Sequence, residues 1–207
     1  YKRQLFTSGA TESNNFALKS ILLHPTFPKE KNHIVSSAIE HKCILTTLDY
    51  LSRNGFTVTY VQPNADGIIE PESVAKAIKD NTALVTVMHV NNELGTVNPV
   101  SKIGAVCKEK GVLFHSDAAQ SFCKEVINVD QDNIDMMSIT AHKIGGPKGI
   151  GAVYIRDLAE QQIEPMMHGG GQESGVRGGT VATPLIEGFG AAIENFPKHY
   201  ATLCGKD

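Results

Sequence analysis

Short, strongly apolar runs alternate with segments of helical periodicity along most of this sequence, and that alternation restricts its fold more than any other feature. The clearest run, at positions 83–90, is almost continuously apolar, which is typical of a central strand covered by helices on both faces. This order predicts an α/β fold built on an open, mostly parallel sheet. Further strands are expected at 33–37, 56–61 and 111–116, with helices ending near 23 and 53 and spanning 71–80, 100–110 and 183–195.

The composition fits one sizeable globular domain and narrows the classes of partner. Of the 207 residues, 41% are hydrophobic and 20% are charged, which is enough apolar material for a real core. The net charge of -3 and the lack of long Lys/Arg runs argue against a sequence-independent hold on nucleic acid or an anionic membrane surface. No apolar run approaches the roughly 18 residues of a membrane span. We therefore expect no nucleic acid and no membrane as direct partners, but small molecules or proteins.

The cysteines and the first residues bear on compartment and completeness. Cys43, Cys107, Cys123 and Cys204 are scattered without a C-x-x-C pair, so neither a disulfide framework nor a zinc site is expected. A reducing, intracellular setting is the default, with each thiol acting as a small buried hydrophobe. Because the chain begins without methionine, we expect a fragment, with targeting segments and whole domains outside it.

The most informative local motif lies at 138–151, where an apolar run leads into His142 and Lys143, and a Gly/Pro-rich turn precedes a second apolar run. The pattern predicts a strand, a lysine, a tight turn and a strand. A lysine at the end of a buried strand suits covalent imine chemistry, because desolvation makes an amine nucleophilic. For this motif alone, a solvated lysine before a hairpin turn is the simpler interpretation.

Polar residues also follow the other predicted strands, where ligand groups gather in open α/β sheets. Asn92 follows the run at 83–90, and Asp117 and Gln120 follow the run at 111–116. An aspartate at the end of a hydrophobic strand is costly to bury unless it meets a cation or a donor. A protonated pyridine nitrogen is one such partner.

Two predicted helix starts carry further candidates. A glycine turn at 8–11 precedes the first helix, whose free N–H groups, with Thr11, suit a phosphate; ordinary Ser/Thr capping is the simpler alternative. His41 stands at a strand-to-helix junction, where a histidine can stack on a planar ring, relay protons or simply face solvent. The glycine-rich segment 167–180 is too long for a simple turn, so it is either mobile or in contact with something.

Several common sites are excluded because their motifs are missing. The sequence contains no G-x-x-x-x-G-K-[ST], no G-x-G-x-x-G after a strand, no G-x-S-x-G and no H-E-x-x-H. What remains resembles the site of a pyridoxal-phosphate enzyme, in which a lysine binds the cofactor covalently and an aspartate keeps the pyridine nitrogen protonated. The residues, in chain order, are Thr11, Asn92, Asp117, Gln120, Thr140, His142 and Lys143.

Six motifs are similar to those of the cysteine desulfurases of the bacterial IscS and mitochondrial Nfs type, over nearly the whole chain (6–189). They lie at 7–15, 40–42, 88–95, 115–120, 141–143 with 146–149, and 168–180. The resemblance implies the large domain of fold type I pyridoxal-phosphate enzymes, class V aminotransferase group: an α/β domain with a mostly parallel seven-stranded sheet flanked by helices, in a homodimer. It implies an incomplete cofactor-binding domain at 1–195 and, at 196–207, the start of a connection to a small C-terminal domain.

Site roles follow from the same resemblance. Lys143 would bind pyridoxal 5'-phosphate covalently, His41 would stack on the ring and relay protons, and Asp117 would pair with the ring nitrogen. Asn92 and Gln120 would approach the ring oxygen. The phosphate would be held by Ala10, Thr11, Thr140 and His142, and in the partner subunit by Thr180. No metal is implied. The chain departs from the family pattern at Thr140-Ala141, where Ser-Gly is usual, at Gly145, where an aromatic residue is usual, and at Ser174, where arginine is usual.

The family reaction converts L-cysteine to L-alanine and an enzyme persulfide, which supplies iron-sulfur cluster assembly and tRNA thiolation. The implied partners are iron-sulfur scaffold and sulfur-acceptor proteins, in the bacterial cytoplasm or mitochondrial matrix. The family's persulfide cysteine lies C-terminal to this chain, so we expect the fragment alone to be inactive. Selenocysteine lyase and an inert scaffold homologue are the alternatives; the hairpin 146–151 favours the desulfurase, and Lys143, Asp117 and His41 together argue against a scaffold.

Overall fold

The computed structural model describes residues 4–158 and 162–203. Cys204, one of the four cysteines, lies outside the described residues, as do the first three residues of the chain. No described helix is both long enough and apolar enough to cross a membrane.

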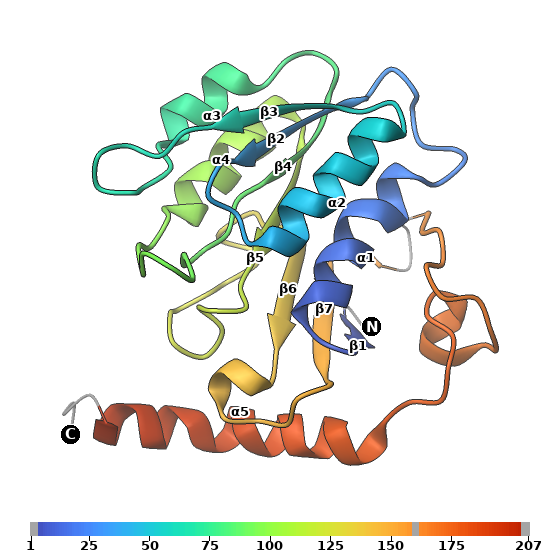
Figure 1. Cartoon of the computed structure of the whole chain (residues 1–207), viewed down its shortest axis with the longest axis vertical. Coiled ribbons are helices and arrows are strands. Elements are labelled where there is room, and N and C mark those ends of the chain that lie inside the picture. The colour runs from blue at the N-terminus through green and yellow to red at the C-terminus, as the bar shows by residue number, and fades with distance from the viewer. Residues whose placement is uncertain (1–3, 159–161, 204–207) are drawn as a thin grey trace.

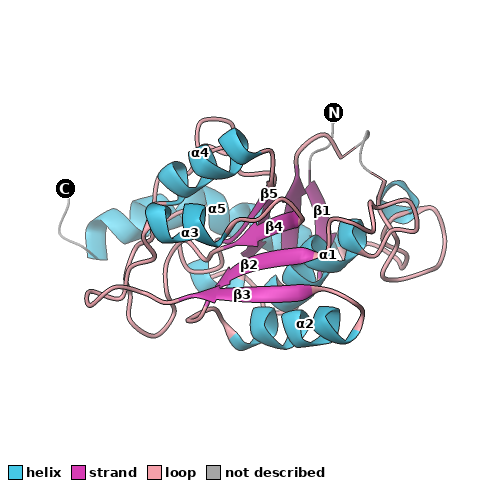
Figure 2. Cartoon of the chain, turned by 90° about the horizontal axis from the view of Figure 1, so that it is seen from above, coloured by secondary structure: helices cyan, strands magenta, loops and turns pink. Residues whose placement is uncertain are grey.

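Within the described residues, seven strands form one sheet in the order β1-β7-β6-β5-β4-β2-β3. Strands β3, β2, β4, β5 and β6 run parallel, whereas β7 is antiparallel to both β6 and β1. The predicted mostly parallel seven-stranded sheet is confirmed (Figure 2). The strands are β1 (Gln4–Thr7), β2 (His33–Ser37), β3 (Thr57–Val61), β4 (Thr82–Thr86), β5 (Leu113–Asp117), β6 (Met136–Thr140) and β7 (Gly151–Ile155).

Helices cover both faces of this sheet. Helices α1 (Ala10–Leu22) and α2 (Lys42–Arg53) lie on one face, and α3 (Pro71–Ala77) and α4 (Val100–Lys110) on the other (Figures 1 and 2). Successive residues of β4 show why its sequence is continuously apolar: Leu84 packs in the core beneath α1 and α2, and Val85 in the core beneath α3 and α4. Each face therefore buries its own apolar cluster.

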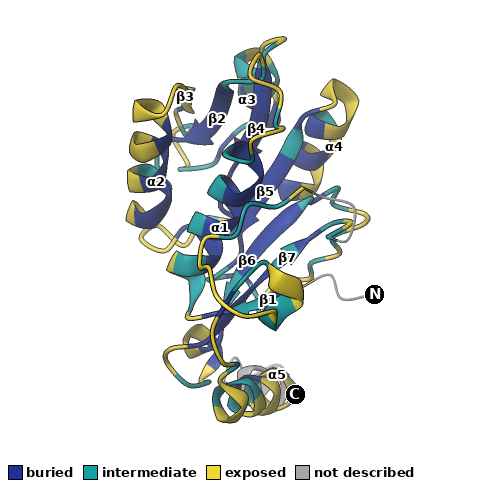
Figure 3. Ribbon diagram, turned by 90° about the vertical axis from the view of Figure 1, so that its right-hand side faces the viewer, coloured by how far each residue is buried: buried dark blue, intermediate teal, exposed yellow. Residues whose placement is uncertain are grey.

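A fifth helix, α5 (Thr183–Leu203), lies apart from these layers, across the end of the β6–β7 hairpin (Figures 1 and 3). Its Phe189 is buried in a third cluster with Ala141 and Ile144, and its ring meets that of Phe122 edge to face at 6.1 Å between centroids. A Cβ on Gly188 would lie 3.0 Å from Pro147. The turn that follows Lys143 is therefore held from outside by α5.

Three predicted boundaries were wrong. The strand expected over 83–90 ends at Thr86, although the N–H groups of Val87 and His89 still donate to main-chain oxygens of β5. The chain then turns back and places Asn98 against the main chain of Met88 and His89. Helix α3 ends at Ala77 instead of position 80, because Ile78 is extended and the next residues turn into β4. Helix α5 continues past position 195, through the start of the predicted connection at 196–207.

Buried polar side chains link three neighbouring strands below the cavity edge of the sheet. His115 on β5 bonds Thr86 Oγ1 through Nδ1 at 2.9 Å and Ser138 Oγ through Nε2 at 3.0 Å. The histidine is fully buried, and this burial lowers its pKa to about 3. His115 therefore stays neutral in the folded protein where an unfolded histidine becomes charged.

The first prediction concerns this histidine and acid stability. Its contribution to stability is present above the unfolded pKa of about 6.5 and is lost as the pH falls towards 3, because only the unfolded chain binds the proton. We expect the loss of unfolding free energy between about pH 7.5 and pH 5.0 to be about 2 kcal/mol smaller in His115→Gln than in the unsubstituted protein. Urea unfolding at the two pH values measures the difference, and equal losses would contradict it.

Candidate active site

A cavity of about 530 Å³ opens at the carboxyl ends of β4, β5 and β6, where open α/β sheets bind their ligands. The β1–α1 turn and the start of α2 complete its wall, so segments distant in sequence meet there. The volume is in the range of small-molecule sites. The predicted site residues that line it are Ala10, Thr11, His41, Asn92, Asp117, Gln120, Thr140, His142 and Lys143.

Asp117, the last residue of β5, is 5% exposed. Its Oδ1 accepts from the main-chain N–H of Ala119 at 2.9 Å, and its Oδ2 accepts from Asn14 Nδ2 on α1 at 2.7 Å. Burial raises the pKa of this carboxyl, and the two hydrogen bonds, with the nearby His41, oppose that rise only in part. Both donors are neutral, so a cationic ring nitrogen would be a favourable partner for this carboxylate.

The start of α1 offers main-chain N–H groups to an anion. Its N-cap is Gly9 (φ 144°), and no side chain caps the helix there, so the predicted alternative of Ser/Thr capping was wrong. Gly151 pairs with Thr7 on one side and with Thr140 on the other, which brings the helix start beside the end of β6. A Cβ on Gly151 would lie 2.8 Å from Gly9 Cα, so only glycine allows this approach.

A hydroxyl and an imidazole lie opposite the start of α1. We call the start of α1 together with Thr140 and His142 the cradle. Thr140 Oγ1 and His142 Nδ1 lie 2.9 Å apart, and Thr140 Oγ1 is 3.9 Å from the position of a Cβ on Gly9. Burial lowers the pKa of His142, and the nearby Lys143 and Lys148 lower it further. Helix N–H groups, a hydroxyl and two lysines fit the charge and donors that a phosphate requires.

Lys143 lies in a single 3₁₀ turn, His142–Ile144, directly after β6. Its side chain lines the cavity but is exposed in this chain. The prediction of a lysine shielded from water was therefore wrong for the single chain. Gly145 ends the turn at φ 79°, a conformation that glycine adopts without strain. The departure from the family's aromatic residue at this position therefore suits the local backbone.

His41 is the N-cap of α2 and is exposed on its cavity side. Its Nδ1 accepts the main-chain N–H of Cys43 at 3.2 Å, and the Cys43 Sγ lies 3.0 Å from the same nitrogen. The capping bond is local to the strand-to-helix junction and anchors the ring at the cavity wall.

Thr180 is not brought to this cavity. It lines a smaller neighbouring one of about 170 Å³ together with Arg177 and Glu173. The two cavities share Ser8 and Gly149 in their walls, so Thr180 lies near the cradle but on its far side.

The wall also contains residues that the sequence did not single out, among them Glu12, Cys43 and Lys148, and Asn14 lies directly behind it. One sequence signal could have pointed to Asn14. It occupies a position in the apolar stripe of α1, with Ala17, Leu18 and Ile21 at helical spacing, and it is fully buried. A buried amide in such a stripe indicates a specific polar partner.

Within the described residues, no cluster of three or more His, Cys, Asp or Glu side chains could hold a metal ion.

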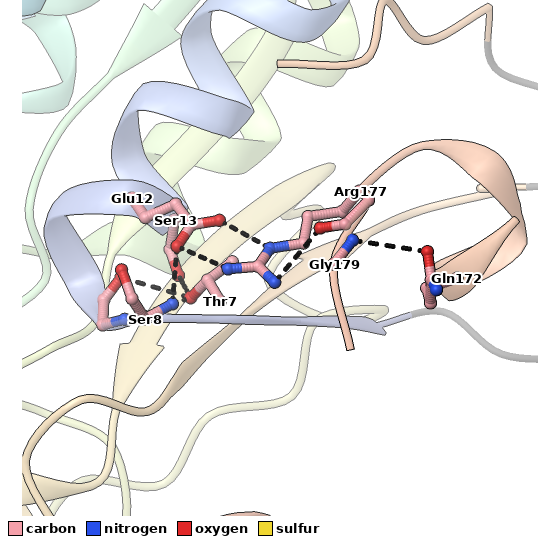
Figure 4. A network of polar contacts seen from close by, with 9 residues as sticks. Thr7, Ser8, Glu12, Ser13, Gln172, Arg177 and Gly179 are labelled. Carbon is pink, nitrogen blue, oxygen red and sulfur yellow. Dashed lines mark hydrogen bonds and ion pairs between the residues drawn. The ribbon is translucent and has the colours of Figure 1, made fainter. Parts of the chain in front are cut away.

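An ion pair ties the glycine-rich segment to the cradle (Figure 4). Arg177 donates from Nε to Glu12 Oε1 at 2.9 Å and from Nη2 to Glu12 Oε2 at 3.2 Å, and the Ser8 N–H donates to Oε2 at 2.6 Å. Burial by itself raises the pKa of Glu12, but the bonds from Arg177 and Ser8 bring it below its usual value. Both side chains are less than one-fifth exposed, so the pair is shielded from solvent.

Comparison with known proteins identifies the family. The family model described as aminotransferase class-V matches residues 2–201. The chain is 51% identical over 193 residues to a mitosomal cysteine desulfurase of Encephalitozoon cuniculi, covering 93% of this chain and 45% of that protein. It is also 51% identical to the cysteine desulfurase IscS of Rickettsia massiliae, covering 93% and 47%. The chain thus spans about half the length of these curated relatives.

Solved structures are also similar to the chain in fold and in sequence. One titled "SspA in complex with cysteine" has a TM-score of 0.89 and 54% identity, covering 94% of this chain and 55% of that one. A NifS-like protein has a TM-score of 0.89 and 40% identity, covering 99% and 57%.

The second prediction concerns the Glu12–Arg177 pair. Arg177→Gln leaves a shielded carboxylate without its cation, so we expect faster proteolytic cleavage within 168–180 and a loss of about 1 kcal/mol in unfolding free energy. Limited proteolysis with mass spectrometry and urea unfolding measure the two effects. Arg53→Gln, on the exposed end of α2, is the matched control and should cleave like the unsubstituted protein. Equal cleavage rates in both variants would contradict the prediction.

Proposed function

The chain belongs to the class-V aminotransferase family, and from this premise we propose that it carries the pyridoxal-phosphate site of a cysteine desulfurase. The observation that carries the proposal is the single cavity in which a strand-end lysine, a buried aspartate and an uncapped helix start meet. The relatives that are about half identical to the chain bear that name, and one similar structure is titled as a complex with cysteine. L-cysteine is therefore the proposed substrate.

The donors of the cavity fit this cofactor. When bound, pyridoxal 5'-phosphate supplies a ring that accepts electrons from the bonds of an attached amino acid. Asp117 would hold the ring nitrogen in its protonated form, which gives the buried carboxylate the cation that its neutral donors do not provide. Lys143 would provide the amine that binds the cofactor. Ala10 and Thr11 at the helix start, with Thr140 and His142 opposite, would hold the phosphate.

His41, Asn92 and Gln120 complete the proposed site. All three line the cavity, with His41 on the α2 side and Asn92 and Gln120 on loops that follow β4 and β5. We assign His41 to stacking and proton relay, Asn92 to the ring oxygen and the substrate, and Gln120 to the ring oxygen. Each has a polar atom that suits this role.

The sulfur acceptor is proposed to lie outside this chain. A persulfide-forming cysteine needs an accessible thiol with a lowered pKa. Burial instead raises the pKa of Cys43, of Cys123 and of Cys107, the last to about 12. These three thiols, which are the cysteines among the described residues, are unsuited to accept sulfur. Cys204 lies outside the described residues, and because it lacks the family's persulfide motif around it, we infer that the chain alone does not complete the reaction.

The wider assignments follow the same proposal. We propose a homodimer in which Thr180 serves the partner's phosphate site, a cofactor-binding domain at 1–195 and a connection at 196–207. The product persulfide would pass to sulfur-acceptor proteins and iron-sulfur scaffolds and would support tRNA thiolation. The curated relatives include bacterial, mitosomal and mitochondrial proteins, which supports an intracellular setting such as the bacterial cytoplasm or mitochondrial matrix.

The third prediction tests the lysine. After pyridoxal 5'-phosphate is added to the full-length protein, we expect a visible absorbance band, and borohydride should fix the cofactor to the peptide that contains Lys143. Lys143→Ala should lose the band and the label, because it removes the amine that faces the cavity. Lys110→Ala, at the exposed end of α4, is the control and should keep both. Label on any other lysine would refute the site assignment.

The fourth prediction tests the reaction. We expect the full-length protein with cofactor to release sulfide and alanine from L-cysteine in the presence of a thiol reductant, and Lys143→Ala to lower kcat by at least about 100-fold. Selenide release from selenocysteine is measured in parallel. A kcat/KM for selenocysteine far above that for cysteine would replace the desulfurase with a selenocysteine lyase. Release of neither product would remove both enzyme assignments.

A further inference from the structure

A chain of buried and partly buried hydrogen bonds joins Asp117 to His41 through two residues to which the proposed function assigns no role. Asn14 Nδ2 donates to Asp117 Oδ2 at 2.7 Å and lies 3.2 Å from Cys43 Sγ. Cys43 Sγ lies 3.0 Å from His41 Nδ1, which also accepts the Cys43 main-chain N–H at 3.2 Å. The order is therefore Asp117, Asn14, Cys43 and His41, from β5 through α1 to the start of α2.

The direction of each bond follows from the donors available. An amide nitrogen carries two hydrogens, so Asn14 donates one to the Asp117 carboxylate and the other to the Cys43 sulfur. The reverse orientation of the amide would set its oxygen against a carboxylate oxygen. In the observed orientation Asn14 Oδ1 has no hydrogen-bond partner among the described residues, although the side chain is fully buried. The carboxylate and the thiol therefore set the orientation of Asn14.

The sulfur, which accepts from Asn14, has its own hydrogen left to donate, and His41 Nδ1 lies 3.0 Å away as an acceptor. Burial raises the pKa of Cys43, and the neighbouring Asp117 and Glu40 carboxyls raise it further, although the bonds from Asn14 and from the Ile44 N–H oppose the rise. The group is therefore a neutral thiol and a donor. The S–H and the main-chain N–H of Cys43 thus share the single lone pair of Nδ1, which leaves this nitrogen no place for a hydrogen of its own.

We propose that Cys43 is a positioning residue that holds His41 as the neutral tautomer with its hydrogen on Nε2, and that Asn14 fixes Cys43 by anchoring it to Asp117. The histidine is thereby oriented by the same amide that orients the aspartate. This goes beyond the proposed function, which assigns His41 and Asp117 separate roles. The kinetic consequence rests on that function, whereas the tautomer does not.

The spectroscopic test uses the full-length protein, free of cofactor and labelled with ¹⁵N-histidine, with the His41 signals assigned by their loss in His41→Gln. We expect an unprotonated Nδ1 and a protonated Nε2 for His41. In Cys43→Ala one of the two donors to Nδ1 is gone, so the Nδ1 signal should shift towards the value of a mixture of tautomers. In Cys43→Ser a hydroxyl can accept from Asn14 and donate to His41, so the signal should stay near that of the unsubstituted protein.

The kinetic test compares the same variants as holoenzymes with L-cysteine. We expect Cys43→Ala to lower kcat/KM by about tenfold and Cys43→Ser to restore it to within about threefold, because correct hydrogen placement on an acid-base group contributes to each turnover. Cys107→Ala is the matched control. That thiol is also buried but packs in the apolar core on the α4 side of the sheet, so its loss should affect stability without moving the His41 signal or kcat/KM.

A protonated Nδ1 on His41 in the unsubstituted protein would overturn the proposal. So would a Cys43→Ala variant that matches Cys107→Ala in both the ¹⁵N signals and kcat/KM. If the full-length protein lacked desulfurase activity, the proposed function would fail, while the His41 tautomer in the cofactor-free protein would still decide the role of Cys43.

Discussion

The buried carboxylate of Asp117 is the group on which the rest of the site depends. A charge at the end of a hydrophobic strand costs several kcal/mol unless donors and a cation surround it. Within the described residues its two hydrogen-bond donors are the neutral Ala119 N–H and Asn14 amide. The protein thus holds the aspartate in place through neutral donors only, and a protonated aromatic nitrogen would supply a cationic hydrogen-bond partner. Burial of the carboxylate therefore makes binding of a cationic partner favourable.

Topology brings the remaining groups to this aspartate. Strands β4, β5 and β6 are parallel, so the residues that follow them reach the same edge of the sheet. The proposed phosphate site, formed by the start of α1 and by Thr140 and His142, is assembled by other strand pairings. Gly151 on antiparallel β7 pairs with both Thr7 and Thr140, and in this way the first helix meets a segment about 130 positions later in the sequence. One glycine, required by its contact with Gly9, joins the two halves of the cradle.

The sequence predicted the features that follow from local chemistry and missed those set by packing. The class of fold, the sheet and most elements follow from periodicity, and the strand-end positions of Asp117 and Lys143 follow from where the apolar runs stop. The end of β4 at Thr86 was not predictable, because the apolar run continues beyond it and residues 87–89 still hydrogen-bond β5 outside the regular strand. The roles of Asn14 and Cys43 also could not be assigned, since they depend on contacts between α1, α2 and β5 that no local pattern shows.

The proposed homodimer would explain both the exposure of Lys143 and the position of Thr180. An amine that must act as a nucleophile gains from exclusion of water, yet in this chain the lysine side chain is exposed. Thr180 has a hydroxyl suited to phosphate, yet it lies in the neighbouring cavity, across Ser8 and Gly149 from the cradle. In the proposed homodimer, a second copy that carries its own Thr180 segment to this cradle would supply the hydroxyl and cover the lysine together. In that homodimer the Glu12–Arg177 pair would also position the glycine-rich segment for contact with the partner.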